Sequence, residues 1–193
     1  MIHFVLGGAR SGKSYFAEQQ ALLHAKKYKK QAVYIATATA VDDEMNARIN
    51  KHQQYRSELF QLVESPLELC ATLAKAQSGN VYLLDCLTLW LNNVIFSQQS
   101  LQDKELERKV EHHLAQEIEQ LIQTLSREFS KKERDIIIVS NEVGLGVIPM
   151  GESTRLFVDY CGWLNQGVAK IAQQVTLLTA GIPLTLKPDN HSN

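Results

Sequence analysis

Apolar runs and helix-like patterns alternate along the chain. Runs that are apolar throughout predict buried strands. They cover residues 2–6, 32–38, 60–64, 80–88 and 135–140, and the run 80–88 includes the turn that ends its strand. Elsewhere the apolar residues recur at i+3 and i+4 spacing, which is typical of amphipathic helices. These patterns predict helices over residues 13–27, 42–56, 66–77, 89–96, 102–130 and 153–174.

The order of these elements predicts the fold class. Strands that are apolar on both faces and separated by helices indicate a mostly parallel sheet covered by helices on both sides. The last two runs, "VTLLTAG" and "IPLTLK", meet at Gly181 and leave no room for a helix between them. We therefore expect them to form an antiparallel hairpin at the sheet edge. We predict one α/β domain, residues 1–187, and a flexible tail, residues 188–193.

Composition narrows the function classes. The chain has 193 residues, of which 45% are hydrophobic and 21% charged, as in ordinary globular proteins. A net charge of −1 gives no field that attracts nucleic acid, and no apolar run reaches the roughly 18 residues of a membrane span. The N-terminus lacks the pattern of a signal peptide, and three distant cysteines offer neither a metal site nor a disulfide framework. We expect a cytoplasmic enzyme or switch.

The segment "GGARSGKS" carries a phosphate-binding pattern. Gly7, Gly12, Lys13 and Ser14 fit G-x-x-x-x-G-K-[ST], between a predicted strand and a predicted helix. The glycines let backbone N–H groups curl around a phosphate, and the helix N-terminus adds partial positive charge. Lys13 is expected to reach the β- and γ-phosphates, and the Ser14 hydroxyl to bind Mg²⁺. The sequence therefore predicts a site for a nucleoside triphosphate.

An acidic residue follows the strand "VYLLD". Asp85 ends that apolar run, where a P-loop protein places the carboxylate that orients Mg²⁺. A strand-terminal aspartate is also a common helix N-cap. Beside a phosphate loop we favour the magnesium role for Asp85, with Ser14 as the second protein ligand.

One histidine lies among cations in the predicted helix 42–56. His52 has Arg48 and Arg56 one turn on either side. A solvated helix face explains this pattern without any function. A neutral imidazole is also a good nucleophile near pH 7, and flanking arginines suit the binding of a triphosphate. The stretch alone leaves both interpretations open.

Six segments together resemble one family. They are "GGARSGKS", "YIATA", "DDEMNARINKH", "DCLTLWLNN", "IIIVSNEVGLGVIP" and "GWLNQGVAKIAQQV". In this order they are similar to the bifunctional adenosylcobinamide kinase / adenosylcobinamide-phosphate guanylyltransferases of cobalamin biosynthesis, over residues 2 to about 187. The resemblance implies a RecA-like P-loop fold, usually a homotrimer. It implies phosphorylation of adenosylcobinamide, then transfer of GMP from GTP to adenosylcobinamide phosphate.

The resemblance also implies roles for individual residues. The family's R-I-x-x-H pattern matches Arg48 to His52, which makes His52 the nucleophile that carries GMP. With GTP and ATP as substrates and Mg²⁺ as cofactor, the implied nucleotide contacts are Gly7, Gly8, Ala9, Arg10, Ser11, Gly12, Lys13, Ser14, Thr37, Ala38, Thr39, Gln53, Gln54, Tyr55, Arg56, Glu64 and Asp85. The chain departs from many relatives at Gln53, where they have a cation, and at Val158, where they have arginine.

Two other functions compete with this one. A small-molecule P-loop kinase with a structural His52 would form no covalent nucleotide adduct. A nucleotide-dependent switch would bind GTP without turning over an acceptor, but the N-K-x-D motif of GTPase switches is missing from the sequence. For Trp90 and Trp163 we favour packing in the core over contact with the corrinoid.

Overall fold

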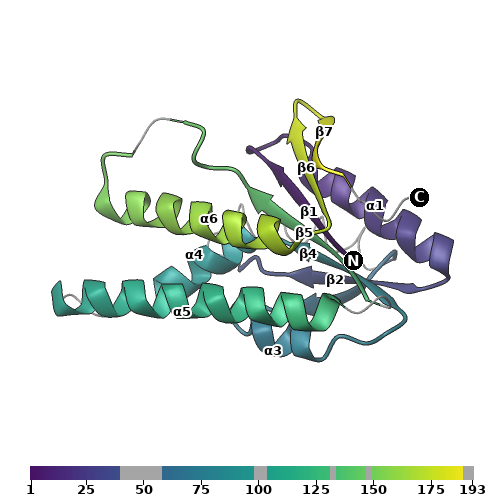
Figure 1. The fold of residues 1–193 in the computed structure, drawn as a ribbon, viewed down its shortest axis with the longest axis horizontal. Coiled ribbons are helices and arrows are strands. Elements are labelled where there is room, and N and C mark those ends of the chain that lie inside the picture. The colour runs from purple at the N-terminus through teal and green to yellow at the C-terminus, as the bar shows by residue number, and fades with distance from the viewer. Residues whose placement is uncertain (40–57, 98–103, 131–133, 147–148, 189–193) are drawn as a thin grey trace.

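The computed structural model describes residues 1–39, 58–97, 104–130, 134–146 and 149–188, and Figure 1 shows their fold. They build a seven-stranded sheet with the order β3-β2-β4-β5-β1-β6-β7. Every neighbouring pair is parallel except β6 and β7, which are antiparallel. The strands are β1 (Ile2–Gly7), β2 (Gln31–Ala36), β3 (Gln61–Glu64), β4 (Asn80–Asp85), β5 (Asp135–Asn141), β6 (Gln174–Thr179) and β7 (Ile182–Lys187).

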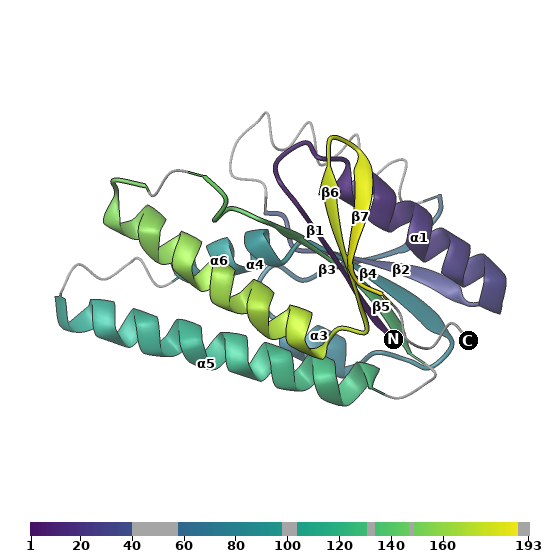
Figure 2. The same cartoon turned by 45° about the horizontal axis from the view of Figure 1, so that its top comes forward.

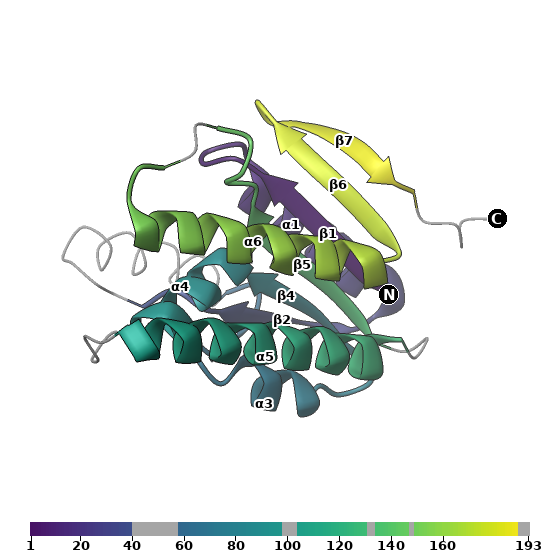
Figure 3. The same ribbon diagram turned by 60° about the vertical axis from the view of Figure 1, so that its left-hand side comes forward.

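Helices cover both faces of the sheet. One face carries α1 and the other carries α5 and α6 with α3 and α4, as Figures 2 and 3 show. The helices are α1 (Lys13–Tyr28), α3 (Leu69–Ala74), α4 (Leu87–Ser97), α5 (Lys104–Phe129) and α6 (Glu152–Ile171). The predicted parallel sheet, its two helical layers and the antiparallel hairpin at its edge are therefore confirmed.

Small side chains let α1 lie close to the sheet. Ala17, Ala21 and Ala25 recur at i+4 spacing and are buried, so one smooth helix face meets the apolar strands. The helix ends at Lys29, which has a left-handed backbone with φ of 53°, and the Lys30 N–H donates to the carbonyl of Ala25 at 2.8 Å. This C-cap satisfies carbonyls that the last helical turn leaves without partners.

The opposite face holds the larger core. Trp90 of α4 is fully buried, and its indole N–H donates to the Leu67 carbonyl at 3.1 Å. The predicted core position of Trp90 is therefore confirmed. The same prediction is wrong for Trp163, whose side chain is 56% exposed. Trp163 lies on the outer side of α6, where its ring meets Tyr160 edge-on with centroids 4.8 Å apart.

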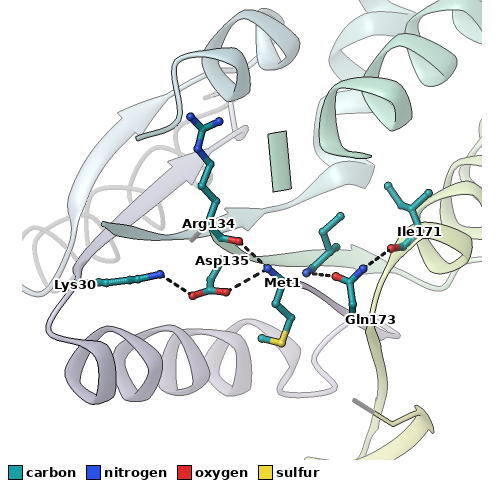
Figure 4. A network of polar contacts seen from close by, with 7 residues as sticks. Met1, Lys30, Arg134, Asp135, Ile171 and Gln173 are labelled. Atoms are coloured by element: carbon teal, nitrogen blue, oxygen red, sulfur yellow. Dashed lines mark hydrogen bonds and ion pairs between the residues drawn. The ribbon is translucent and has the colours of Figure 1, made fainter. Parts of the chain in front are cut away.

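A polar network ties the strands together at the amino edge of the sheet, as Figure 4 shows. The amino group of Met1 donates to the Arg134 carbonyl at 2.6 Å and to the Asp135 carboxylate at 3.2 Å. Lys30 donates to the second oxygen of Asp135 at 3.0 Å. On the other side, Gln173 accepts from the Ile2 N–H at 2.6 Å. The network joins β1, β5 and the starts of β2 and β6.

Some predicted elements have different bounds in the structure, and others lie outside the described residues. The helix predicted over 66–77 is shorter, Leu69–Ala74, because a tight turn in which the Leu69 N–H donates to the Leu67 carbonyl precedes it. The helix predicted over 42–56 lies outside the described residues. Of the predicted tail, only Pro188 is described.

Candidate nucleotide-binding site

The carboxyl ends of the parallel strands gather most of the predicted site at one edge of the sheet. Strand register places Gly7 opposite Asn141, and it places Ala36 opposite both Asp85 and Glu64. The phosphate loop therefore begins at the same edge as Asp85, the Thr37–Thr39 segment and Glu64. In open α/β sheets this edge is where ligands bind.

The phosphate loop has the backbone that its sequence predicts. Arg10 and Gly12 both have positive φ, 57° and 90°, a region that glycine adopts at little cost. At Gly7 a side chain has no room, because a Cβ there would lie 2.7 Å from the Leu178 carbonyl. The loop closes with the Ser11 N–H donating to the Gly8 carbonyl at 3.3 Å. A glycine is thus required at Gly7 by space and at Gly12 by backbone conformation.

The C-terminal hairpin supports this loop from the side. Ala180 and Gly181 join β6 to β7 with φ of 52° and 80°, as a tight type I′ turn requires. The Gly181 N–H donates to the Ser11 carbonyl at 2.9 Å. The hairpin thus supports a loop that lies about 170 positions before it in the sequence. The sequence predicted the hairpin but not this contact.

Lys13 and Asp85 are electrostatically coupled. The pKa of Lys13 is lowered because burial disfavours its ammonium form, while its interactions with Cys86 and Asp85 act in the opposite direction. The ammonium donates to the Gly8 carbonyl at 3.0 Å. Asp85 accepts a hydrogen bond from the Tyr34 hydroxyl at 2.7 Å. A phosphate beside Lys13 would supply the anion that a partly buried ammonium favours.

Asn93 holds the predicted Thr37–Thr39 segment in place. The Asn93 amide donates to the Thr37 carbonyl at 2.8 Å and accepts from the Thr39 hydroxyl at 3.1 Å. The Thr37 hydroxyl is buried and bonds both the N–H and the carbonyl of Cys86, at 2.9 and 2.7 Å. Thr37 therefore joins the end of β2 to the residue after Asp85. Sequence reasoning missed Asn93, although two adjacent asparagines on the mainly apolar α4 were visible in "DCLTLWLNN".

A second polar group lies at the end of β5. The Asn141 side chain donates to the Thr88 hydroxyl at 2.8 Å, and its carbonyl accepts from the Asn165 amide at 3.0 Å. The Glu142 N–H donates to the Gly7 carbonyl at 3.2 Å. Sequence reasoning used Asn141 and Glu142 only as part of a family motif and gave them no role.

The predicted site is only partly described. Ala38 and Thr39 follow β2, and Glu64 ends β3 with an exposed side chain. His52 and the predicted contacts Gln53, Gln54, Tyr55 and Arg56 lie outside the described residues. Their roles stay predictions.

The fold and this edge define the class of protein. A strand of the parallel sheet leads into a glycine-rich loop with Lys13 and Ser14, and a helix follows. This arrangement is that of a P-loop nucleotide-binding protein of the RecA-like type. A solved structure with a similar fold is the flagellar accessory protein FlaH from Methanocaldococcus jannaschii. It has a TM-score of 0.51 and 14% identity, covering 96% of this chain and 77% of that one.

Sequence comparison gives the family. The model of the family described as cobinamide kinase / cobinamide phosphate guanyltransferase matches residues 3–186. The chain is 41% identical to the bifunctional adenosylcobalamin biosynthesis protein CobP of Pseudomonas aeruginosa, covering 97% of this chain and 98% of that protein. It is 36% identical to the corresponding protein CobU of Escherichia coli, covering 97% and 100%. The chain therefore belongs to the cobinamide kinase / cobinamide phosphate guanyltransferase family.

Among the described residues, no helix is both long enough and apolar enough to cross a bilayer.

Proposed function

We propose that the protein phosphorylates the aminopropanol hydroxyl of adenosylcobinamide with ATP or GTP, and then transfers GMP from GTP to the new phosphate. The products of the second step are adenosylcobinamide-GDP and pyrophosphate. The observation that carries the proposal is the phosphate loop, in which Lys13 lies beside Asp85 at the ligand-binding edge of the sheet. Membership of the cobinamide kinase / cobinamide phosphate guanyltransferase family supports a cobinamide as the acceptor. Because ATP and GTP are intracellular substrates, we place the reaction in the cytoplasm.

Mg²⁺ fits the side chains of this edge. Magnesium prefers oxygen ligands and is usually held by one or two protein groups, with phosphates and water completing the shell. Ser14 lies in the first turn of α1 and Asp85 ends β4, so a hydroxyl and a carboxylate offer oxygen ligands at one edge. In the part of the chain that is described, no three His, Cys, Asp or Glu side chains gather into a metal cluster. We propose that Ser14 and Asp85 hold Mg²⁺, which neutralises charge on the triphosphate.

His52 is the proposed nucleophile of the second step. Its imidazole nitrogen attacks the α-phosphorus of GTP, the bond to the β-phosphate oxygen breaks, and pyrophosphate leaves. A phosphate oxygen of adenosylcobinamide phosphate then attacks the same phosphorus, and the P–N bond breaks. The proposal rests on the match to the family pattern from Arg48 to His52.

Labelling with GTP tests the transfer step. The wild-type protein, incubated with α-labelled GTP and Mg²⁺ and then denatured, should keep label that is acid-labile and alkali-stable, as a phosphoramidate is. Mapping should place the label on His52. The His52→Ala protein should lose labelling and adenosylcobinamide-GDP formation, but should keep most of its kinase activity, because direct phosphoryl transfer needs no histidine nucleophile.

The matched control is His112→Ala, because His112 is an exposed histidine on α5. It should label like the wild type. Labelling of the His52→Ala protein at saturating GTP would overturn the assignment of the nucleophile. Binding of GTP without any turnover of adenosylcobinamide or its phosphate would overturn the function itself.

We also propose that the protein is a homotrimer, as the family resemblance implies. Light scattering coupled to size-exclusion chromatography should then give about three times the 21.8 kDa of one chain. A mass of one or two chains at micromolar concentration would contradict this proposal.

A further inference from the structure

Glu142 is a carboxylate beside the phosphate loop to which nothing above gives a role. It directly follows β5, which lies between β1 and β4 in the sheet. β1 leads into the phosphate loop and β4 ends in Asp85. The Glu142 N–H donates to the carbonyl of Gly7, the first residue of the loop, at 3.2 Å. The backbone of Glu142 is therefore attached to the start of the phosphate loop, one strand away from Asp85.

Hydrogen bonds on both sides hold this position. The preceding residue, Asn141, is held through its side chain by the Thr88 hydroxyl and through its carbonyl by the buried Asn165 amide. One oxygen of Glu142 accepts from the Gly144 N–H at 3.1 Å, which fixes the carboxylate close to its own backbone. Within the described part of the chain, its second oxygen has no hydrogen-bond donor. A half-buried carboxylate with one oxygen held and one available suits proton acceptance.

The other described carboxylates at this edge fit the task less well. Asp85 accepts from the Tyr34 hydroxyl and is the proposed ligand of Mg²⁺, a role that requires it to stay ionised. Glu64 ends β3, four strands from β1 in the sheet order. At about 4.8 Å per strand this separation approaches 20 Å. Of these three residues, Glu142 is the one whose backbone bonds to the loop and that is not assigned to the metal.

We propose that Glu142 is the general base of the kinase step. Its carboxylate accepts the proton of the acceptor hydroxyl as that oxygen attacks the γ-phosphorus. The bond from the γ-phosphorus to the β-phosphate oxygen breaks, and the nucleoside diphosphate leaves with that electron pair. Glu142 then passes the proton to solvent. The inference rests on the kinase half of the proposed function.

Glu142→Gln separates this role from a structural one. Glutamine has the same shape and keeps an oxygen that accepts from the Gly144 N–H, but it does not take up the proton. General-base catalysis contributes about 100- to 10,000-fold, so kcat for phosphorylation of adenosylcobinamide should fall about 100-fold or more, with KM changed less than threefold. GMP transfer to supplied adenosylcobinamide phosphate, and labelling by α-labelled GTP, should stay within threefold of the wild type.

One control variant and four possible outcomes complete the test. Glu152→Gln, at an exposed glutamate in the first turn of α6, makes the same charge change and should leave both steps intact.

A Glu142→Gln protein with near-normal kinase kcat would overturn the proposal, because capping of Gly144 would then be the only role of Glu142. Rescue of the variant by raised Mg²⁺ would show a metal ligand instead. Equal loss of both steps would indicate a general defect of the site. A wild-type protein that does not phosphorylate adenosylcobinamide in the same assay would refute the proposed function itself.

Discussion

Two aspartates on neighbouring strands, Asp85 of β4 and Asp135 of β5, lie at opposite ends of the same sheet. Asp135, at the amino edge, meets two cations, the Met1 amino group at 3.2 Å and Lys30 at 3.0 Å. Asp85, at the carboxyl edge, accepts from the neutral Tyr34 hydroxyl. The nearby Lys13 directs its own hydrogen bond to the Gly8 carbonyl. The protein thus pairs Asp135 with two of its own cations at the amino edge, whereas Asp85 lies near Lys13 at the edge where the phosphate loop begins.

This difference separates stability from ligand binding. A buried carboxylate with two cationic partners is costly to disturb, because each lost partner leaves a charge in a poorly hydrated place. At the carboxyl edge we propose that the same types of side chain bind a triphosphate and a metal ion, which arrive with charges of their own. Mutations at the two ends should therefore change different measurements.

The largest expected effect is at Lys13. Lys13→Ala removes the cation that we propose contacts the β- and γ-phosphates, and loss of one such group typically costs about 100- to 1,000-fold in rate. We expect kinase activity to fall by that factor while the melting temperature changes by less than about 2 °C. Steady-state kinetics measures the kinase activity, and calorimetry measures the melting temperature. Lys26→Ala, on the exposed last turn of the same helix, is the control. Normal phosphorylation by Lys13→Ala would disprove the assigned role.

The next effect is at Asp85. Asp85→Asn keeps the side-chain size but removes the negative charge offered to Mg²⁺. We expect the Mg²⁺ concentration for half-maximal activity to rise about tenfold, equivalent to about 1.4 kcal/mol. A titration of activity against Mg²⁺ at fixed nucleotide measures the shift, with the exposed Asp159→Asn as control. An unchanged Mg²⁺ dependence would mean that Asp85 is a structural residue at the end of β4.

At the amino edge of the sheet, we expect a mutation to change the stability of the protein and not its activity. Asp135→Asn removes a charge that two partly buried cations share, and hydrogen bonds to charged groups contribute about 1.5–3 kcal/mol. For a chain of this length we expect the melting temperature to fall by about 3–8 °C. Kinase activity per folded molecule should not change at temperatures well below the transition. A loss of activity without a loss of stability would break the contrast between the two edges.

The smallest expected effect is the pH dependence of the stability that Asp135 contributes. Burial alone raises the pKa of Asp135, but the hydrogen bond from Lys30 and the charge of the Met1 amino group outweigh it, and the pKa is lowered from 3.8. A lowered folded-state pKa stabilises the protein above the unfolded value and loses that effect as pH falls through the folded value. The difference in melting temperature between wild type and Asp135→Asn should be constant between about pH 5 and pH 7 and shrink at lower pH. A difference that grows on acidification would contradict this assignment.

The sequence predicted local patterns well. The phosphate loop was recognisable because its glycines, Lys13 and Ser14 are adjacent in sequence and their chemistry requires that spacing. The strands were recognisable because parallel strands buried on both faces are apolar throughout. The edge hairpin followed from the short distance between its two strands at Gly181.

Contacts between distant segments were not predictable in the same way. The Gly181 N–H that supports Ser11 is a backbone group, so no residue type marks it. Asn93 and Asn165 act through amides on mainly apolar helix faces, and only the folded structure shows which carbonyls they reach. Trp163 has the residue type of a core side chain, but the helical period places it on the outer side of α6. Pattern alone does not specify which neighbours a helix face will have.

The position of β1 in the middle of the sheet has a consequence for synthesis of the protein. Residues 2–7 form a buried apolar strand whose two partners are residues 135–141 and 174–179. On the ribosome this strand emerges more than 120 residues before the first partner and about 170 before the second. At about 5–20 residues per second, the growing chain carries an apolar strand without its final neighbours for several seconds. The phosphate loop that follows this strand reaches its supported form only when residue 181 has left the ribosome. We therefore expect the phosphate loop to bind nucleotide only after the C-terminal hairpin has been made, although the motif for it is made first.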